Sequence, residues 1–326
     1  MKILVTGSAG FIGAATSSFL ISKGFEVVGI DNLNDYYDPS LKNARLSQFF
    51  NCKKYKHYHL DISNSSELET CFEHEKPSIV INLAAQAGVR HSIDNAKVFL
   101  DSNITGFLNI LEACRKHSIQ HLIYASSSSV YGGNTLTPYS TKHRTDKPLN
   151  IYGVTKKTNE LMAYAYNNLY NLQSTGLRFF TVYGPWGRPD MALLKFVNHI
   201  VNNKPINLYN YGNHTRDFTF IDDVVFTIYQ IINLYKISND TKNTSDIINV
   251  GAGKPTSLIY FVKCIEDCLG KKAIINYLPP ALGDMLETSC DVEDLFKKIN
   301  FIPNTPLIEG ISRTIKWYFE FKNLKF

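Results

Sequence analysis

The sequence contains no run of like charge, no paired cysteine motif and no apolar stretch of membrane-spanning length. Its 34 basic and 29 acidic residues are scattered along the chain, so the net charge of +5 forms no nucleic-acid-binding run. The six cysteines lack CxxC spacing and neighbouring histidines, which argues against a disulfide scaffold and against a metal site. The chain opens on a short β-type run instead of a signal peptide. We therefore expect a cytoplasmic protein with neither a membrane nor a nucleic-acid partner.

The chain has enough apolar residues for a large core and enough length for two lobes, with 326 residues of which 44% are hydrophobic. Apolar runs of strand length alternate with segments of helix length through its first half. Runs that are apolar on both faces and are joined by helical crossovers form a parallel sheet covered by helices, the doubly wound (Rossmann) α/β fold. The predicted strands are Ile3–Thr6, Glu26–Asp31, Tyr55–Leu60, Ser78–Asn82, His121–Ala125 and Ser174–Phe179.

The pattern changes near residue 181, where a loop rich in glycine and proline begins. Shorter strands and helices follow, so we expect a smaller, interleaved C-terminal α/β lobe. The segment of about 217–245 is expected to return to the first lobe. The sequence thus predicts a doubly wound first domain over 1–181 with that segment, and a second lobe over 182–216 and 246–326.

A glycine-rich turn, TGSAGFIG, follows the first strand and opens a helix. Glycines in this context let the backbone approach a pyrophosphate and let the helix pack closely on the strand, while the helix N-terminus stabilises the negative charge. A preceding strand, a following helix and a second strand ending in an acid are the context that makes the pattern informative. The residues expected to hold the dinucleotide here are Gly7, Gly10, Phe11, Ile12 and Gly13.

Asp31 ends the second strand, where a carboxylate binds the adenosine ribose hydroxyls. An aspartate repels a 2′-phosphate, and neither Asn32 nor Leu33 supplies an arginine to bind one, so the sequence favours NAD over NADP. Asp61 and Ile62, after the third strand, are placed either to flank the adenine or to cap the strand.

Tyr152 and Lys156 lie four residues apart at the head of a long helical stretch, so their side chains share one face. A nearby ammonium and an oxidised nicotinamide both favour phenolate over phenol, which lowers the tyrosine pKa and lets the residue act as a base. A serine run, 126–129, follows the strand before this helix, at the sheet edge where doubly wound folds bind ligands. Its hydroxyls can share a proton with a substrate oxygen or make local turn hydrogen bonds.

Over essentially the whole chain these motifs resemble the extended short-chain dehydrogenase/reductase superfamily, and more narrowly its nucleotide-sugar epimerases. The stretches DNLNDYYD (31–38), GPWGRPDMAL (184–193) and RDFTFIDD (216–223) are similar to those of bacterial and plant UDP-glucuronate 4-epimerases. The resemblance implies an enzyme that interconverts UDP-glucuronate and UDP-galacturonate, and it implies a homodimer joined by the helices around 96–116 and 150–170.

By this resemblance the reaction is a transient oxidation. Tyr152, partnered by Lys156, takes the proton of the C4 hydroxyl, hydride passes to NAD, the 4-keto sugar turns over, and hydride returns to its other face. Ser127 is implied to hydrogen-bond the sugar. Further implied contacts with the sugar come from Ser128, Ser129 and Thr181. Arg90 is placed either to line the pocket or to be a charge that flanks a helix.

The rest of the substrate is implied to be read outside the first lobe. Arg188 is the candidate for a bidentate clamp on the glucuronate carboxylate, which must be held out of alignment with the C4 carbonyl to prevent loss of carbon dioxide. The alternative is an arginine that caps the loop or pairs with Asp190. Arg216 matches a diphosphate-binding arginine, and Asp284 matches a residue that contacts the nucleoside. The chain departs from the family pattern at Ala281 and Leu282, which places one of these contacts in doubt.

Other reactions on the same scaffold remain open at this point. Sugar dehydratases carry an Asp-Glu pair where this chain has Ser128 and Ser129, so elimination of water is disfavoured. A decarboxylase that makes a UDP-pentose and an epimerase for neutral UDP-hexoses are the nearest alternatives. A dinucleotide-sensing protein without turnover is a more distant one, and the presence of both Tyr152 and Lys156 argues against it.

Overall fold

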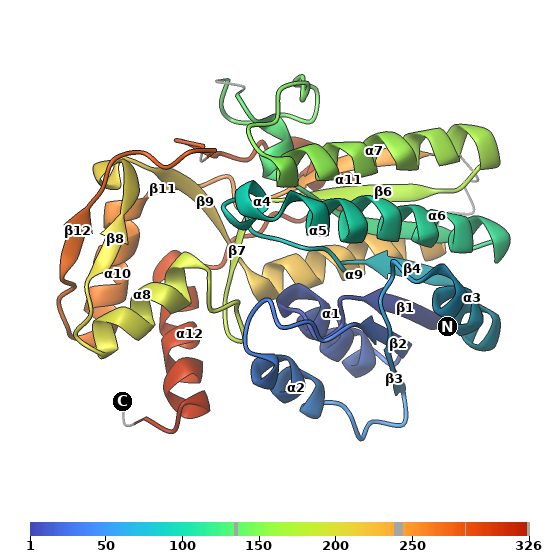
Figure 1. Cartoon of the computed structure of the whole chain (residues 1–326), viewed down its shortest axis with the longest axis horizontal. Coiled ribbons are helices and arrows are strands. Elements are labelled where there is room, and N and C mark those ends of the chain that lie inside the picture. Colours follow the sequence, from blue (N-terminus) through green and yellow to red (C-terminus); the bar gives the residue numbers. More distant parts are fainter. Residues whose placement is uncertain (134–135, 238–243, 284, 325–326) are drawn as a thin grey trace. The chain divides into compact units, whose positions relative to one another are not determined.

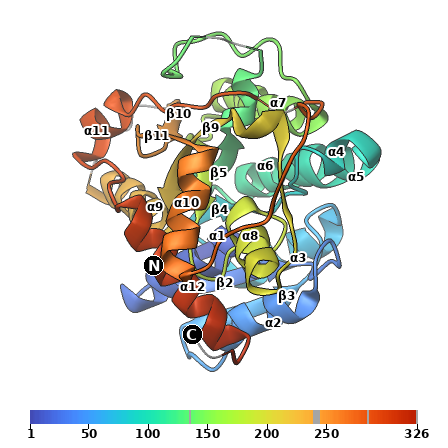
Figure 2. The same cartoon turned by 90° about the vertical axis from the view of Figure 1, so that its left-hand side faces the viewer.

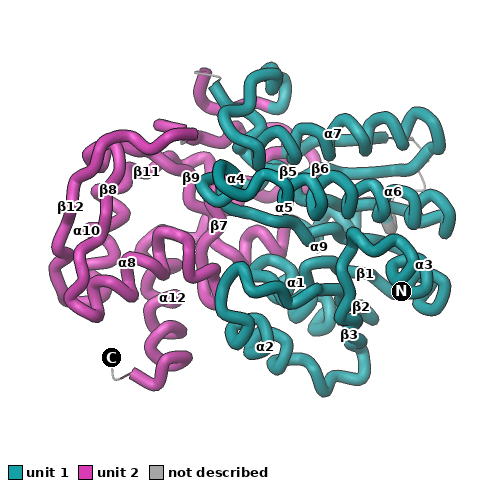
Figure 3. The backbone as a smooth tube through the Cα atoms, viewed as in Figure 1, with its two compact units in different colours: residues 1–134, 141–179, 228–248 teal, residues 135–140, 180–227, 249–326 magenta. Residues whose placement is uncertain are grey.

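The computed structural model describes residues 1–133, 136–237, 244–283 and 285–324. The chain packs into two compact units, each assembled from separate segments (Figure 3). Unit 1 comprises residues 1–134, 141–179 and 228–248, and unit 2 comprises residues 135–140, 180–227 and 249–326. The division describes packing, and the roles assigned to the two lobes stay predictions.

Unit 1 is built on a seven-stranded sheet with the order β10-β6-β5-β4-β1-β2-β3. Adjacent strands from β6 to β3 all run parallel. The sheet order reverses direction at β1 and β4, which is the topological switch point of a doubly wound fold. The predicted fold class is confirmed, and each of the six predicted runs coincides with a strand to within two residues. The strands are β1 (Lys2–Thr6), β2 (Glu26–Asp31), β3 (Tyr55–His59), β4 (Ile79–Asn82), β5 (His121–Ser127), β6 (Ser174–Phe179) and β10 (Ser245–Val250).

The helices of unit 1 form two groups. Helices α6 and α7 lie side by side (Figure 1), and α3 packs against α6. The second group contains α1 and α9, which meet where the rings of Phe19 and Tyr229 lie 5.5 Å apart. The helices are α1 (Phe11–Ser22), α2 (Pro39–Ser47), α3 (Ser65–Glu75), α4 (His91–Asp94), α5 (Ala96–Leu100), α6 (Gly106–Lys116), α7 (Ile151–Tyr170) and α9 (Ile221–Ile237, which begins in unit 2), with a π-helix η1 (Asp101–Thr105) and a 3-10 turn η2 (Ser128–Tyr131).

Helix α7 has well-defined ends. It begins at Ile151 because the Asn150 side-chain oxygen accepts a hydrogen bond from the Gly153 N–H at 2.8 Å, as expected of an N-cap residue. It ends at Tyr170 because Asn171 takes the left-handed conformation, with φ of 56°. The 20 residues between these caps present Tyr152 and Lys156 in the first two turns.

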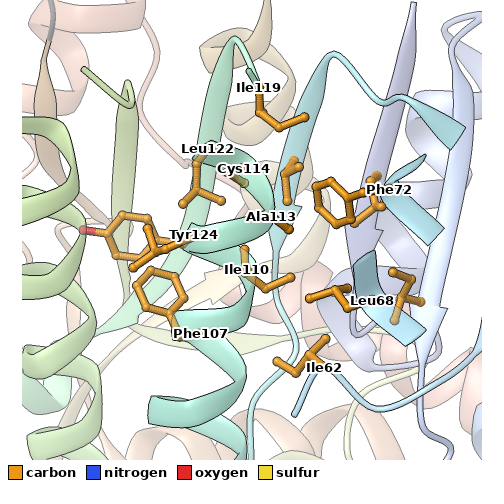
Figure 4. Close-up of a cluster of buried hydrophobic side chains, with 14 of the residues drawn as sticks. Ile62, Leu68, Phe72, Phe107, Ile110, Ala113, Cys114, Ile119, Leu122 and Tyr124 are labelled. Carbon is orange, nitrogen blue, oxygen red and sulfur yellow. The ribbon is translucent and has the colours of Figure 1, made fainter. Parts of the chain in front are cut away.

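A buried apolar cluster fixes β4 and β5 against α3 and α6 (Figure 4). Phe107, Ile110 and Cys114 recur at helical spacing on α6 and face Leu122 of β5 and Phe72 of α3 within the cluster. Burying each such large side chain contributes about 1.5–3 kcal/mol. The cluster therefore anchors β5, the strand whose carboxyl end carries the start of the serine run.

Unit 2 combines two small sheets with helices. β9 pairs with β7 in parallel and with β11 in antiparallel, and β8 pairs with β12 in parallel. Helices α8, α10 and α12 pack together (Figure 2). The elements are β7 (Thr181–Tyr183), β8 (Ile206–Leu208), η3 (Tyr209–Gly212), β9 (Thr215–Phe220), β11 (Pro255–Ser257), β12 (Ile275–Tyr277), α8 (Ala192–Val201), α10 (Leu258–Leu269), α11 (Glu293–Ile299) and α12 (Leu307–Phe321).

The described residues lack two features that would indicate a membrane or a metal ion as a partner. None of their helices combines the length and the apolar character needed to cross a membrane. The same residues contain no group of three or more His, Cys, Asp or Glu side chains placed to hold a metal ion.

Candidate active site

The turn between β1 and α1 requires glycine at two positions. Gly7 has a φ of +67°, and a Cβ there would lie 2.8 Å from the Ala84 nitrogen. A Cβ on Gly13 would lie 1.9 Å from the Gly7 carbonyl oxygen. The Gly10 N–H donates to that same oxygen at 2.9 Å, which closes the turn. Gly10 is the N-cap of α1 and has no side chain, so the first N–H groups of the helix can face an anion.

Asp31 lies beside this turn with its carboxylate already oriented. The Ala9 N–H donates to one oxygen at 3.0 Å, and the Leu33 N–H donates to the other at 2.8 Å. An ionised carboxylate offers about four acceptor positions, so two backbone donors leave capacity for a pair of ribose hydroxyls. The side chain is buried, which makes its charge more effective than it would be in water.

Replacing Asp31 with alanine is expected to weaken NAD binding by roughly ten- to hundredfold, the equivalent of the 1.5–3 kcal/mol of a hydrogen bond to a charged group. Titration of the NAD-free protein with NAD, followed by calorimetry, measures this. Asp35→Ala is the matched control, because Asp35 is an exposed aspartate in the same segment. Equal Kd values for the two variants would contradict the ribose contact.

The residues after β3 form a capped turn. Asn32 donates to the Asp61 carboxylate at 2.7 Å, and the N–H and hydroxyl of Ser63 donate to it at 2.8 and 2.7 Å. Burial raises the pKa of Asp61, but the hydrogen bonds from Ser63 and Asn32 outweigh it and lower the pKa overall. The Ile62 side chain belongs to the apolar cluster (Figure 4). That Asp61 and Ile62 flank the adenine, and that Asn32 is among the cofactor-binding residues, stay predictions.

Lys156 is held beneath the head of α7. Its Nζ donates to the Ala125 carbonyl of β5 at 2.8 Å and lies 6.0 Å from the centre of the Tyr152 ring. Only 2% of the residue is exposed, and burial lowers the pKa of the ammonium to about 8. The Tyr152 ring meets Phe99 of α5 edge to face, with ring centres 6.3 Å apart. Tyrosine and lysine are thus fixed next to each other, as the four-residue spacing predicts.

The serine run lies against the same end of α7. A Cβ on Gly153 would lie 2.7 Å from the Ser129 carbonyl oxygen, so the start of the helix packs directly on η2. Ser127 is buried, and its Oγ accepts a hydrogen bond from the Ser129 N–H at 3.1 Å. This is the local turn bond that the sequence left open, yet a hydroxyl that accepts in this way keeps its own proton for donation. Ser128 is buried in the same turn.

A buried ion pair that sequence reasoning missed lies one turn beyond Lys156. Arg178 of β6 donates through Nε and Nη2 to the two oxygens of Glu160, both at 2.8 Å. The Ser126 hydroxyl donates to Glu160 at 2.7 Å, and Arg178 Nη1 donates to the Tyr131 hydroxyl at 3.0 Å. Burial raises the pKa of Glu160, but Arg178 and Ser126 lower it overall. A signal was available, since Glu160 follows Lys156 by four residues on a helix.

Asn103 links the site to the loop after β4. It lies in the π-helix η1, accepts from the Gln86 N–H at 2.8 Å, and donates to the Gln86 carbonyl and the Thr155 hydroxyl, both at 3.0 Å. Asn159 of α7 donates to the Asn103 carbonyl at 2.7 Å. π-helical turns occur often at functional sites, and here the irregular turn is tied to α7 through two side chains.

The remaining expected site residues are placed as follows. Arg90 is exposed and directly precedes α4. In unit 2, Thr181 begins β7, Arg188 forms a two-point ion pair with Asp190, and Arg216 Nη1 donates to the Leu286 carbonyl at 3.1 Å. Asp284 lies outside the described residues. Their contacts with a substrate stay predictions.

Unit 1 therefore combines a dinucleotide-binding turn at the switch point with a serine, a tyrosine and a buried lysine at the adjoining sheet edge, the arrangement of a Rossmann-fold enzyme that uses a nicotinamide cofactor. The model of the NAD dependent epimerase/dehydratase family matches residues 3–251, and the chain belongs to this family. The predicted family is confirmed.

Three similar proteins cover nearly the whole chain. Protein CapI of Staphylococcus aureus is 48% identical, over 98% of this chain and 99% of its own length. A UDP-glucuronate 4-epimerase of Thermodesulfobacterium geofontis is 42% identical, over 96% of this chain and 95% of its own. The crystal structure of UDP-glucuronic acid 4-epimerase from Bacillus cereus, in complex with UDP-glucuronic acid and NAD, has a TM-score of 0.89 at 29% identity, covering 98% of this chain and 100% of that one.

Proposed function

We propose that the protein is an NAD-dependent UDP-glucuronate 4-epimerase, an isomerase that interconverts UDP-glucuronate and UDP-galacturonate. The observation that carries the proposal is the fixed juxtaposition of Tyr152 with buried Lys156 at the head of α7, packed on the serine run of β5 and η2. The similarity to the two UDP-glucuronate 4-epimerases supports the choice of substrate.

The residues of unit 1 fit NAD. The close approach of Gly7, Gly10 and Gly13 leaves no room for side chains, so the helix N-terminus is accessible to a pyrophosphate. Asp31 supplies oriented acceptors for the adenosine ribose and would repel a 2′-phosphate. When bound, NAD supplies the chemistry of accepting a hydride from the sugar C4 and returning it.

Tyr152 acts as the base. Its phenolate oxygen takes the proton of the C4 hydroxyl as the carbonyl forms, and the same oxygen gives the proton back after the sugar has turned over, so the protein is unchanged at the end of the cycle. Lys156, held by the Ala125 carbonyl, favours the phenolate through its charge. Ser127 donates its hydroxyl proton to the sugar oxygen and orients C4.

A C4 ketone next to the glucuronate carboxylate makes a β-keto acid, which loses carbon dioxide when the breaking bond aligns with the carbonyl π system. Arg188 is assigned to hold the carboxylate away from that alignment. Its guanidinium matches a carboxylate in two-point geometry, and its 20% side-chain exposure gives partial shielding from water.

We assign the UDP half of the substrate to residues of unit 2, with Arg216 at the diphosphate and Asp284 at the nucleoside, and further sugar contacts to Ser128, Ser129, Thr181 and Arg90. A homodimer is proposed on the exposed apolar side chains that α5, α6 and α7 carry, among them Leu100, Leu108, Val154 and Leu161. A cytoplasmic location and a role in supplying polysaccharide synthesis complete the proposal.

A proton NMR time course of the purified protein with UDP-glucuronate tests the function, following the anomeric and H4 signals first without added NAD and then with it. The proposal requires UDP-galacturonate to appear and to reach a constant ratio with the substrate. A UDP-pentose as the main product would show that the protein is a decarboxylase and not an epimerase. Turnover of UDP-glucose or UDP-N-acetylglucosamine, without turnover of UDP-glucuronate, would show that the proposed substrate is wrong.

Replacing Arg188 with alanine is expected to weaken UDP-glucuronate binding by about ten- to hundredfold, because a charged hydrogen-bonding partner is lost, and to leave UDP-glucose binding within about twofold. Carbon dioxide and a pentose-type product should accompany the remaining turnover. Kd values for both sugars and product analysis check this. Lys263→Ala, which removes an exposed cation of unit 2, is the control, and equal losses for both sugars would contradict the assignment of Arg188.

A further inference from the structure

The loop that carries Arg188 is tightly constrained. Gly184 has a φ of +151°, and a Cβ there would lie 2.4 Å from the Ile221 side chain. The Gly187 N–H donates to the Gly184 carbonyl at 3.2 Å, and the Met191 N–H donates to the Arg188 carbonyl at 3.2 Å. Two successive turns thus bracket the arginine before α8 begins, so the backbone at Arg188 has a defined position.

Within the first of these turns, Trp186 anchors the loop to α12. Its backbone takes a φ of 63°, a conformation that is costly for a bulky residue and needs support from its surroundings. Its ring lies 5.1 Å from that of Trp317 and 5.3 Å from that of Phe321, both on α12. Trp317 and Phe321 in turn stack at 5.3 Å. This aromatic cluster offsets the strain and ties the loop to α12.

Asp190 binds the edge of the Arg188 guanidinium that is formed by Nε and Nη2. Nε lies 3.0 Å from one oxygen of Asp190, and Nη2 lies 2.5 Å from the other. The carboxylate therefore occupies the side edge of the planar group, in a pairing of residues only two positions apart. The pair is partly shielded, with side-chain exposures of 20% for Arg188 and 35% for Asp190.

We propose that Asp190 is a positioning residue that sets selectivity for a sugar acid by fixing the plane of the Arg188 guanidinium. The inference rests on the proposed function of Arg188. A guanidinium has a second two-point edge, formed by Nη1 and the remaining N–H of Nη2, and that edge matches a carboxylate equally well. With the side edge bound to Asp190, the second edge has one orientation only. The substrate carboxylate then meets an arginine that does not have to be ordered on binding.

The Asp190 carboxylate also repels a substrate carboxylate, so the ordering of the guanidinium must outweigh this repulsion for Asp190 to favour a sugar acid. Asp190 accepts from two of the five N–H groups, and a guanidinium remains fully protonated beside a carboxylate. A neutral sugar gains nothing from the second edge, because it has no carboxylate for the two-point match. The influence of Asp190 should therefore appear in the preference between acidic and neutral sugars, whereas a purely structural role would affect both equally.

The test compares Kd values of UDP-glucuronate and UDP-glucose for the NAD-loaded protein and for its Asp190→Ala and Asp190→Asn variants. We expect Asp190→Ala to weaken UDP-glucuronate binding about tenfold and UDP-glucose binding less than twofold. The Kd of UDP-glucuronate for Asp190→Asn, which keeps one acceptor, should lie between the values for the wild type and for Asp190→Ala. The fraction of turnovers that release carbon dioxide should rise in the same order.

Folding of the loop can be followed directly, because both tryptophans of the chain lie in the aromatic cluster. Unchanged fluorescence emission of Asp190→Ala shows that the loop keeps its place. Glu293→Gln, which removes the acid of an exposed lysine pair on α11, is the control for a change of charge in unit 2.

Four results would overturn the inference. Equal losses for both sugars would reduce Asp190 to a structural role, and tighter binding of UDP-glucuronate by Asp190→Ala would make it a competitor of the substrate. If the wild type prefers UDP-glucuronate to UDP-glucose and Asp190→Ala keeps the same preference, Asp190 has no role in selectivity, while the proposed function still stands. A wild-type protein that binds both sugars equally would overturn the sugar-acid preference itself and this inference with it.

Discussion

Tyr152→Phe is expected to lower kcat by about 10²–10⁴-fold and to leave the Kd of UDP-glucuronate within about twofold. The substitution removes one oxygen, which is the group proposed to take and return the C4 proton, and general acid–base catalysis contributes this much to a rate. The ring remains, so its edge-to-face contact with Phe99 and its place over Lys156 are kept. Single-turnover NMR of the NAD-loaded variant measures the rate, and calorimetry measures binding.

Tyr170→Phe supplies the matched control, because Tyr170 is the last residue of the same helix and is exposed. It should retain wild-type kcat. If Tyr152→Phe kept more than about a tenth of the wild-type kcat, another group would have to be the base. If instead both kcat and substrate binding collapsed together, the hydroxyl would serve binding and not proton transfer.

Local spacing was sufficient to predict which of the candidate side chains lie together within one β-α-β unit or on one helix. The glycines of the first turn and Asp31 at the end of β2 follow each other in sequence, and the geometry of a parallel sheet places them side by side. Tyr152 and Lys156 are neighbours because four residues make about one helical turn. In these cases the backbone periodicity alone determines which side chains meet.

Contacts between distant segments were not predictable in this way. Arg178 and Glu160 meet across β6 and α7. Helical spacing indicates that Glu160 shares a face with Lys156, but no periodicity links Glu160 to Arg178 on the next strand. Asp61 and Ile62 illustrate a related difficulty, since residues after a strand can face a ligand, a turn or the core. Asp61 accepts from Ser63, and Ile62 packs in the apolar cluster, choices that depend on α6 and the loop rather than on the strand itself.

Glu160→Gln is expected to lower the free energy of unfolding of the protein by about 3–5 kcal/mol, because it leaves the buried Arg178 guanidinium without its charged partner. Each of the two side chains is only 4% exposed, so water cannot replace the lost carboxylate. Turnover should fall as well, since the same carboxylate accepts from the Ser126 hydroxyl next to Ser127. Urea unfolding monitored by circular dichroism measures the stability, and the NMR time course measures the turnover.

Because Glu160 is ionisable, the loss of unfolding free energy in Glu160→Gln should depend on pH. Its pKa lies below the ordinary carboxyl value in the folded chain, so the unfolded chain binds the proton more readily and the ion pair stabilises the fold at neutral pH. That contribution is lost as the pH falls through the folded pKa. The difference between wild type and Glu160→Gln should therefore be largest near pH 7 and shrink in acid.

A double-mutant cycle separates the ion pair from packing. Combining Glu160→Gln with Arg178→Met removes the unmatched charge and should recover part of the stability lost in Glu160→Gln alone, because replacing both members of a buried pair costs less than breaking it. Asp101→Asn, which breaks an exposed pair with Lys97, should change stability by less than about 1 kcal/mol. A loss of that small size for Glu160→Gln would mean that β5, β6 and α7 are held together by apolar packing alone, and that the serine run keeps its place without the ion pair beneath it.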